Sequence, residues 1–214
     1  MLPWRYIVVE GVIGVGKTSL VKLLATRNDA RVNLEVVEEN PFLGRFYQNR
    51  AAYAFQTQIF FLLSRFRQQQ QLTQPELFQR LVVSDYLFAK DRIFANLNLS
   101  DDELTLYNQL AGILEDRILK PDLVVYLQAS TDLLMARIDQ RGRAYELGMD
   151  REYIDSLNRA YNFFFHHYQD TPLLVVGADQ LDYVGVPDDL NLLIDQLSEP
   201  FTGTRYFAPR SGGV

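Results

Sequence analysis

Two glycines, a lysine and a threonine near the start of the chain are spaced so that they could hold a phosphate. Their arrangement, Gly11-x-x-x-x-Gly16-Lys17-Thr18, is the phosphate-binding loop pattern. Glycines let the backbone turn several N–H groups toward one anion, and a helix starting here adds a favourable field. Lys17 would reach the β- and γ-phosphates of a nucleoside triphosphate, and Thr18 would offer its hydroxyl to Mg²⁺. The loop residues expected to surround the phosphates are Gly11, Val12, Ile13, Gly14, Val15, Gly16, Lys17 and Thr18.

Carboxylates end two other apolar segments that could face this phosphate. Asp85 closes Val-Val-Ser-Asp, which resembles the strand-plus-aspartate element that binds Mg²⁺ beside a phosphate loop. Glu39 closes Leu-Glu-Val-Val-Glu-Glu, and the Asn-Pro that follows must end this segment. A carboxylate beside a magnesium–phosphate site can take a proton from an attacking hydroxyl. We therefore expect Glu39 to be the general base, with Asp85 as the alternative and Glu38 as a solvated neighbour.

Strand and helix patterns alternate along the chain, and these elements must position the loop and the acids. The segments expected to be strands, rich in valine and leucine, are 5–10, 34–39, 80–85, 122–127 and 172–177. The segments expected to be helical are 17–27, 44–71, 86–99, 101–119, 130–141 and 150–168. This alternation predicts an α/β fold with a five-stranded parallel sheet and helices on both faces. The ligand site should then lie at the C-terminal ends of the strands.

Composition narrows the classes of protein that remain. The 214 residues fit one domain, which we place at 1–199, followed by a flexible tail at 200–214. A net charge of -6 argues against a nucleic-acid partner. The absence of cysteine excludes disulfides, thiolate catalysis and zinc–sulfur sites. The longest apolar run, 59–63, is too short to span a bilayer, and the N-terminal residues lack the layout of a signal peptide, so a cytoplasmic protein is expected.

Several ordered motifs together resemble the deoxyribonucleoside kinases, and most closely their bacterial deoxyadenosine/deoxyguanosine branch. The resemblance covers about residues 5–185 and is carried by EGVIGVGKTSL, EENPFLGRFY, FQTQIFFLLSRFR, SDYLFAKDRIFA, LKPDLVVYLQAS and RIDQRGRAYELGM. It implies the phosphate-loop kinase fold and transfer of the γ-phosphate of ATP to the 5′-hydroxyl of a deoxynucleoside. A purine nucleoside is the expected acceptor, with Mg²⁺ as cofactor.

The resemblance also implies roles for residues around the acceptor. Glu39 matches the glutamate that contacts the 5′-hydroxyl, and Tyr47 matches the tyrosine that binds the 3′-hydroxyl. Gln58 and Arg65 have the family's spacing for its base-reading pair, and seven residues apart they share one side of a helix. Asp91 matches the aspartate that completes this base-reading group.

Further matches concern the donor nucleotide and the mobile lid of the family. Arg141 and Arg143 match the lid arginines over the transferred phosphate, so Arg141 is also a candidate catalytic residue. Glu146 matches the lid glutamate that reaches the sugar. The loop 178–183, which includes Asp179, resembles the segment that lies against the adenine of ATP.

The chain departs from the family directly after Asp85. Relatives usually carry an arginine there, whereas this chain has Tyr86. Lys90, five residues after Asp85, could supply the missing positive charge.

Two alternative functions and a homodimer complete the expectations. A nucleoside monophosphate kinase of the thymidylate kinase type needs extra cations for its acceptor, and 55–71 supplies just Arg65 and Arg67. A non-catalytic nucleotide-binding module would leave the strand-end acids and the lid arginines without a role. The resemblance implies a homodimer, and 103–119 is apolar over an arc wide enough to pair with a second copy.

Overall fold

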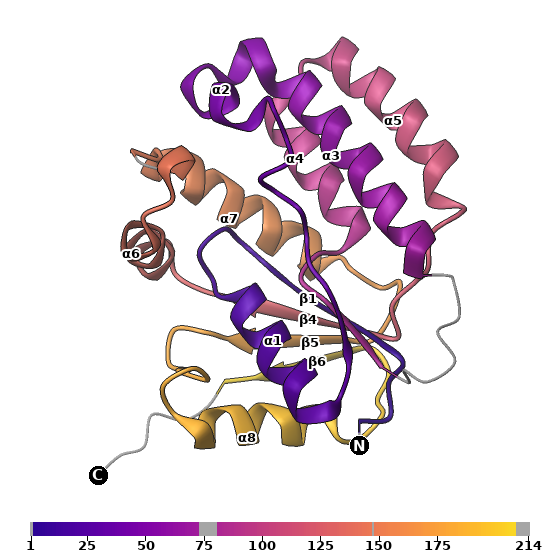
Figure 1. The fold of residues 1–214 in the computed structure, drawn as a ribbon, viewed down its shortest axis with the longest axis vertical. Helices are drawn as coiled ribbons and strands as arrows, with labels where there is room; N and C mark the ends of the chain where they lie inside the picture. Colours follow the sequence, from indigo (N-terminus) through magenta and orange to yellow (C-terminus); the bar gives the residue numbers. More distant parts are fainter. Residues whose placement is uncertain (1, 73–80, 147, 209–214) are drawn as a thin grey trace.

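The computed structural model describes residues 2–72, 81–146 and 148–208, and its centre is a parallel sheet. The strands lie in the order β2-β3-β1-β4-β5-β6, and every pairing is parallel (Figure 1). Their bounds are β1 Tyr6–Gly11, β2 Arg31–Asn33, β3 Val82–Ser84, β4 Leu123–Gln128, β5 Leu173–Gly177 and β6 Thr204–Phe207. Valine and leucine side chains of β1, β4 and β5 are buried on both faces of the sheet, as the continuous apolar pattern predicts.

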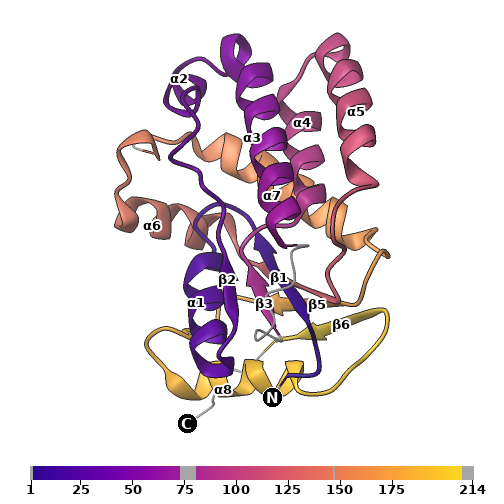
Figure 2. The same ribbon diagram turned by 45° about the vertical axis from the view of Figure 1, so that its right-hand side comes forward.

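Helices cover both faces of this sheet. Helices α1 and α8 lie on one side, α4 and α7 lie on the other, and α3 and α5 stack beyond α4 (Figures 1 and 2). The α-helices are α1 Lys17–Asn28, α2 Leu43–Gln48, α3 Arg50–Leu72, α4 Asp91–Asn98, α5 Asp101–Glu115, α6 Thr131–Arg141, α7 Arg151–His166 and α8 Pro187–Leu197. Two short 3₁₀ helices, η1 Phe88–Lys90 and η2 Ala144–Glu146, precede α4 and follow α6. The α/β class predicted from the sequence is confirmed.

The sheet has six strands in the described residues, where the sequence predicted five. The additional strand, β6, lies within 200–214, the segment expected to be a flexible tail. It pairs with β5 from Leu173↔Thr204 to Val176↔Phe207. The pattern was inconspicuous because β6 is short and lies at an edge, where alternate side chains stay exposed.

The second strand is also shorter and earlier than predicted. The sequence predicted a strand at 34–39, but β2 ends at Asn33. Its partner β3 ends at Ser84, opposite Asn33, so the backbone beyond has no ladder to continue. The N–H of Glu35 instead donates to Asp85 Oδ1 at 2.8 Å. The predicted helix over 44–71 is likewise two helices, α2 and α3, separated at Asn49.

Candidate active site

The phosphate loop has the conformation that its glycines predict. Gly14 and Gly16 have φ values of 88° and 105°, in the left-handed region that disfavours other residues. A side chain at Gly16 would also collide with the hydroxyl of Tyr183. The carbonyl of Val15 accepts hydrogen bonds from Arg137 Nη1 at 2.7 Å and from Tyr183 Oη at 3.2 Å. The loop therefore has a fixed shape at the N-terminus of α1.

The Lys17 ammonium lies inside this loop. Its Nζ donates to the carbonyls of Gly11 at 2.7 Å and Val12 at 3.2 Å. Burial lowers the pKa of Lys17 to about 8, although the nearby carboxylate of Glu10 acts in the opposite direction. Glu10 is fully buried and accepts from the N–H groups of Gly11 at 2.9 Å and Leu87 at 2.8 Å. It thereby connects the phosphate loop to the segment that leads into α4.

Thr18 and Asp85, the two residues predicted to bind Mg²⁺, are in direct contact. Thr18 Oγ1 donates to Asp85 Oδ2 at 2.6 Å. Asp85 follows β3 and is almost fully buried. Its other carboxylate oxygen, Oδ1, accepts a hydrogen bond from the N–H of Glu35. Among the described residues no three His, Cys, Asp or Glu side chains form a metal-binding group. A hydroxyl and one carboxylate fit a Mg²⁺ ion that takes its other oxygens from phosphates and water.

Glu39 does not occupy the position predicted for it. It is exposed in a turn. Two cavities, described below, lie near the C-terminal ends of the strands, and Glu39 lines neither of them. The acidic side chain beside Asp85 is Glu35, from the extended segment that follows β2. The strand expected at 34–39 would have placed Glu39 at this edge, but β2 ends six residues before it.

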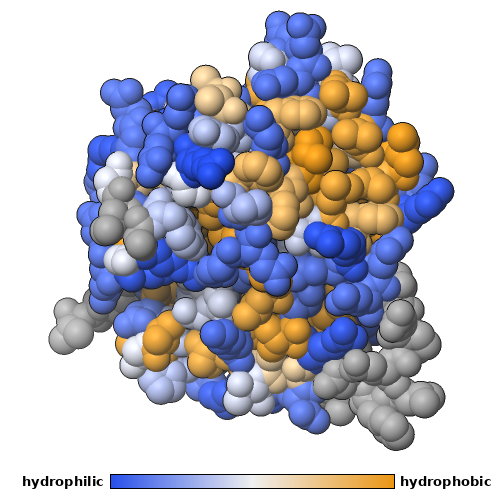
Figure 3. All heavy atoms as spheres, turned by 45° about the horizontal axis from the view of Figure 1, so that its top comes forward, coloured by the Kyte–Doolittle hydropathy of each residue, from blue (hydrophilic) through white to orange (hydrophobic). Residues whose placement is uncertain are grey.

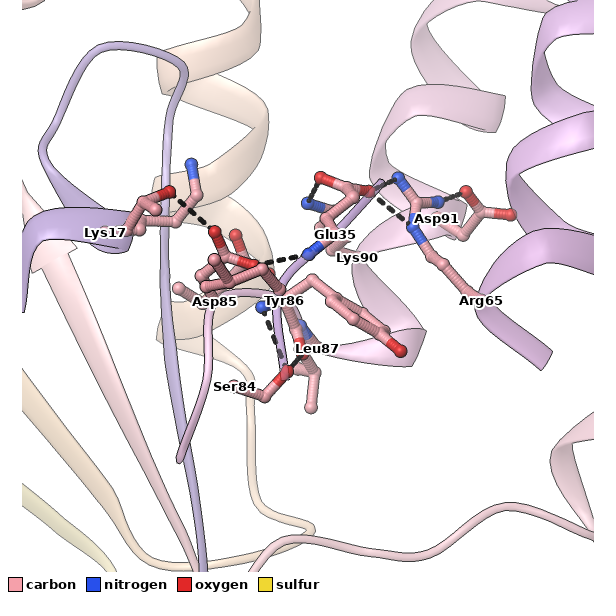
Figure 4. Close-up of polar contacts among 12 residues, drawn as sticks. Lys17, Glu35, Arg65, Ser84, Asp85, Tyr86, Leu87, Lys90 and Asp91 are labelled. Carbon is pink, nitrogen blue, oxygen red and sulfur yellow. Dashed lines mark hydrogen bonds and ion pairs between the residues drawn. The ribbon is translucent and has the colours of Figure 1, made fainter. Parts of the chain in front are cut away.

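Two cations surround the Glu35 carboxylate (Figure 4). Lys90 Nζ lies 2.8 Å from Glu35 Oε2, and Arg65 Nε lies 2.7 Å from Glu35 Oε1. Burial alone would raise the pKa of Glu35, but the charges of Arg65 and Lys90 outweigh it and lower the pKa to about 2. Lys90, the predicted substitute for the missing arginine, therefore contacts Glu35, while the ring of Tyr86 is fully buried.

Arg65 extends this group toward α4. It forms an ion pair with Asp91, whose other carboxylate oxygen accepts from Tyr107 Oη at 3.0 Å. Gln58 Nε2 donates to the backbone carbonyl of Asp91 at 2.8 Å. We call Glu35, Arg65, Lys90 and Asp91 the charge cluster. The three residues predicted to read a base are thus brought together, and Gln58 and Arg65 are buried in place of forming an exposed polar stripe.

An inner cavity of about 290 Å³ lies beside the charge cluster. Tyr47 of α2 lines it, and burial raises the pKa of Tyr47, so its hydroxyl stays protonated and can donate. The Tyr47 ring is parallel to that of Tyr145, with centroids 6.3 Å apart. Aromatic side chains and polar groups of the surrounding helices also line it, among them Phe46, Phe61, Phe94, Thr57, Gln58, Asn98 and Tyr161. Such a cavity suits a flat, partly polar ligand.

The predicted lid residues close one side of the inner cavity. Arg141 at the end of α6 donates to both carboxylate oxygens of Glu146 in η2, at 2.6 and 2.7 Å. Arg143 Nη1 donates to Tyr145 Oη at 2.7 Å, and Arg143 Nη2 lies 3.6 Å from Glu38 Oε1. In this structure the lid arginines therefore pair with acceptors on and near the lid.

An outer cavity of about 1000 Å³ lies on the other side of the phosphate loop. It shares Lys17, Thr18 and both lid arginines with the inner cavity. Asp179, predicted to lie near a bound nucleotide, lines it and accepts from Ser130 N at 3.1 Å and Ser130 Oγ at 2.5 Å. The two cavities therefore meet at the phosphate loop, as donor and acceptor sites of a phosphate transfer must.

A family profile decides the class of protein. The profile described as "Deoxynucleoside kinase" matches residues 7–201. The chain belongs to the deoxynucleoside kinase family. Membership confirms the resemblance and selects the nucleoside kinase prediction over a nucleoside monophosphate kinase and over a non-catalytic module.

Individual deoxynucleoside kinases match over nearly their whole length. A deoxyguanosine kinase from Bacillus subtilis is 32% identical over 199 residues, which cover 91% of this chain and 96% of that enzyme. A deoxyguanosine kinase from Lactobacillus acidophilus is 33% identical and covers 89% of this chain and 88% of its own. The solved structure of deoxyadenosine kinase from M. mycoides with bound dATP is 27% identical, with a TM-score of 0.78, and covers 91% of this chain and all of its own.

Sequence reasoning missed Glu35 and Glu10 as residues of this kinase site. Both lie within apolar segments, where a single acid is easily taken for a strand residue facing solvent. A charge balance indicates Glu35 once the burial of Arg65 and Lys90 is known, because two buried cations need more than the one carboxylate of Asp91.

Proposed function

We propose that this kinase transfers the γ-phosphate of ATP to the 5′-hydroxyl of a deoxynucleoside in the inner cavity, with Glu35 as the carboxylate that receives the hydroxyl proton. The observation that carries this proposal is the contact from Glu35 N to Asp85 Oδ1, next to the contact from Asp85 to Thr18. It brings the Glu35 side of the inner cavity next to the residues that would organise Mg²⁺. ATP would occupy the outer cavity, with its phosphates on the loop.

Glu35 and Asp85 have contacts that suit different tasks. Asp85 already accepts from Thr18 Oγ1 and from the Glu35 N–H, which suits a metal-binding role. Glu35 lines the inner cavity and is ionised at neutral pH, so it can accept a hydrogen bond from the hydroxyl and orient it. Bound Mg²⁺ would neutralise charge on the triphosphate. Lys17 would contact the phosphates, and the lid arginines would exclude water and compensate the charge of the transferred group.

We further propose that purine deoxynucleosides are the preferred acceptors. Support comes from three relatives that are named deoxyguanosine or deoxyadenosine kinase, and from the amide of Gln58 and the guanidinium of Arg65 in the inner cavity. Such groups can donate to and accept from the edge of a base. A cytoplasmic location remains a prediction. In the described part of the chain, no helix is long and apolar enough to cross a membrane.

A matched pair of glutamine substitutions tests the proposed base. We expect Glu35→Gln to lower kcat by about two orders of magnitude or more, the scale of lost base catalysis. Glu39→Gln should stay near wild-type turnover, because Glu39 is exposed and lines neither cavity. Turnover is measured with ATP, Mg²⁺ and each of deoxyadenosine, deoxyguanosine, deoxycytidine and thymidine. A large loss in Glu39→Gln with normal turnover in Glu35→Gln would contradict the assignment, and faster turnover of the pyrimidines would contradict the purine preference.

A homodimer is proposed through the outer face of α3 and α5. Figure 3 shows apolar side chains gathered over this part of the surface. Four large apolar residues are exposed there, Leu63 on α3 and Leu106, Leu110 and Ile113 on α5, and Ile113 is 63% exposed. A contiguous apolar face of this kind is typical of a protein–protein contact. The family resemblance gives a second copy of the chain as the partner.

A further inference from the structure

Arg65 connects two carboxylates that have different positions relative to the inner cavity. Its Nε and Nη2 donate to Glu35 Oε1, and its Nη1 pairs with Asp91. Among the described residues, the cavity lining includes Glu35 and Arg65 but not Asp91. A ligand in the cavity would therefore meet Arg65 together with Glu35, and not together with Asp91.

Both carboxylates that Arg65 contacts, Glu35 and Asp91, are held by further hydrogen bonds. The Asp91 carboxylate also accepts from Tyr107, and its backbone carbonyl accepts from Gln58. Glu35 Oε2 accepts from Lys90 Nζ, and the backbone N–H of Glu35 donates to Asp85. Among the side-chain contacts of the charge cluster, those of Arg65 join the Glu35–Lys90 pair to Asp91, so a movement of the guanidinium away from Glu35 divides the cluster into two halves, Lys90 with Glu35 and Arg65 with Asp91.

A ligand in the inner cavity can separate these halves without leaving a buried charge alone. If Arg65 leaves Glu35, the pair of Arg65 with Asp91 remains and so does the pair of Lys90 with Glu35. Each pair is neutral, which avoids the large penalty of an unpaired buried charge. The N–H groups that Arg65 loses from Glu35 would find acceptors on the ligand.

We propose that a nucleobase in the inner cavity competes with Glu35 for the Nε and Nη2 donors of Arg65, so that binding of the base frees the carboxylate for the 5′-hydroxyl. The inference rests on the proposed function and adds a form of regulation to it. Recognition of the base and preparation of the carboxylate become one event. A sugar without a base leaves Glu35 bound by two cations, which weakens it as a proton acceptor.

The test isolates this competition from the contact between Glu35 and the hydroxyl. The probe is 2′,5′-dideoxyadenosine, which has a base but no 5′-hydroxyl, and its binding is measured by calorimetry without ATP. We expect Glu35→Gln to bind the probe about tenfold more tightly than the wild type, since a charge-assisted contact to Arg65 no longer has to be broken. Glu39→Gln is the matched control and should leave the affinity unchanged.

A second variant guards against a folding defect. Glu35→Gln leaves Lys90 without its carboxylate partner, so Glu35→Gln/Lys90→Met, which removes both charges, is measured in parallel with the same expected gain. Unchanged or weaker binding in folded variants overturns the inference. Normal kcat of Glu35→Gln with deoxyadenosine would instead reject Glu35 as the base, and it would leave the binding result intact.

Discussion

Glu35 and Lys17 carry opposite charges and both line the inner cavity, and burial acts on the pKa of each. The pKa of Glu35 is lowered from 4.5 to about 2, because the charges of Arg65 and Lys90 outweigh the effect of burial. A depressed carboxyl pKa stabilises the fold above its ordinary value near 4.5, and this contribution is lost as the pH falls toward 2. The pKa of Lys17 is lowered by burial, so its charge is lost near pH 8. The enzyme should therefore have Glu35 and Lys17 both charged at neutral pH.

Removal of Lys90 should change the pH at which Glu35 becomes protonated. Lys90→Met takes away one of two cations that lower the pKa of Glu35, so this pKa should rise. The acidic limb of kcat/KM should move upward by about one pH unit, the scale of a lost neighbouring charge. Lys90→Arg keeps the charge and should restore the wild-type profile. An acidic limb that stays in place in Lys90→Met would show that Lys90 does not act on the carboxylate.

Nucleotide binding should weaken as Lys17 loses its proton. The pKa of Lys17 in the nucleotide-free protein is about 8, so the affinity for an ATP analogue should fall as the pH rises through that value. Glu10→Gln removes a charge that raises this pKa, so its midpoint should lie at lower pH. Fluorescence titrations between about pH 6.5 and pH 9.5 measure both midpoints. Coincident midpoints for the two proteins would refute the influence of Glu10.

At the scale of elements, helices and buried strands followed from sequence pattern, while lengths set by pairing did not. The pattern of an apolar strand, a glycine loop and a helix predicted β1 and α1, with Lys17 and Thr18 at the start of α1. The end of β2 depends on where β3 stops, and no local pattern records this, so Glu39 was expected where Glu35 lies. Helix α8 was not expected, although the sequence carries its signals, a proline at its start and Asp188 and Asp189 in its first turn. Edge strand β6 was missed because it has four residues and alternate side chains that stay exposed.

Strand β6 should contribute measurably to stability. Truncation after Gly203 removes its pairing with β5 and the contact of Arg205 with the Phe201 ring, whose centroid is 4.2 Å away. We expect Tm to fall by about 2–8 °C, as a loss of about 1–2 kcal/mol would produce in a chain of this size. Truncation after Ala208 keeps β6 and serves as the control. Equal Tm values for the two truncated proteins, measured by calorimetry, would mean that β6 is dispensable.

At the scale of the whole molecule, both cavities adjoin the phosphate loop at the C-terminal end of β1. The exposed apolar residues of α3 and α5 line neither cavity. The sequence indicated the cavities through the phosphate loop and the family motifs. It indicated the apolar face through 103–119, of which α5 occupies Asp101–Glu115. Gln58 and Arg65 project from α3 into the inner cavity, while Leu63 of the same helix is exposed. Assembly through this helix would therefore support the wall of the inner cavity.

A charge placed on the apolar face should separate the proposed dimer. The wild type should have twice the 24.8 kDa mass of one chain by light scattering. Ile113→Glu should reduce this to a single chain, because it buries a carboxylate in an apolar contact. Leu192→Glu, on the exposed surface of α8, is the matched control and should leave the mass unchanged. A monomeric wild type would contradict the proposed assembly.

The contacts inside the phosphate loop have a thermodynamic consequence for ligand capture. Val15 is bound by Arg137 and Tyr183, and Lys17 bridges two carbonyls, so the loop is ordered before any anion arrives. The entropic cost of shaping it is met when the chain folds and not at each encounter with a nucleotide. Because Lys17 must exchange its two carbonyl partners for phosphate oxygens, the heat released on capture should be modest.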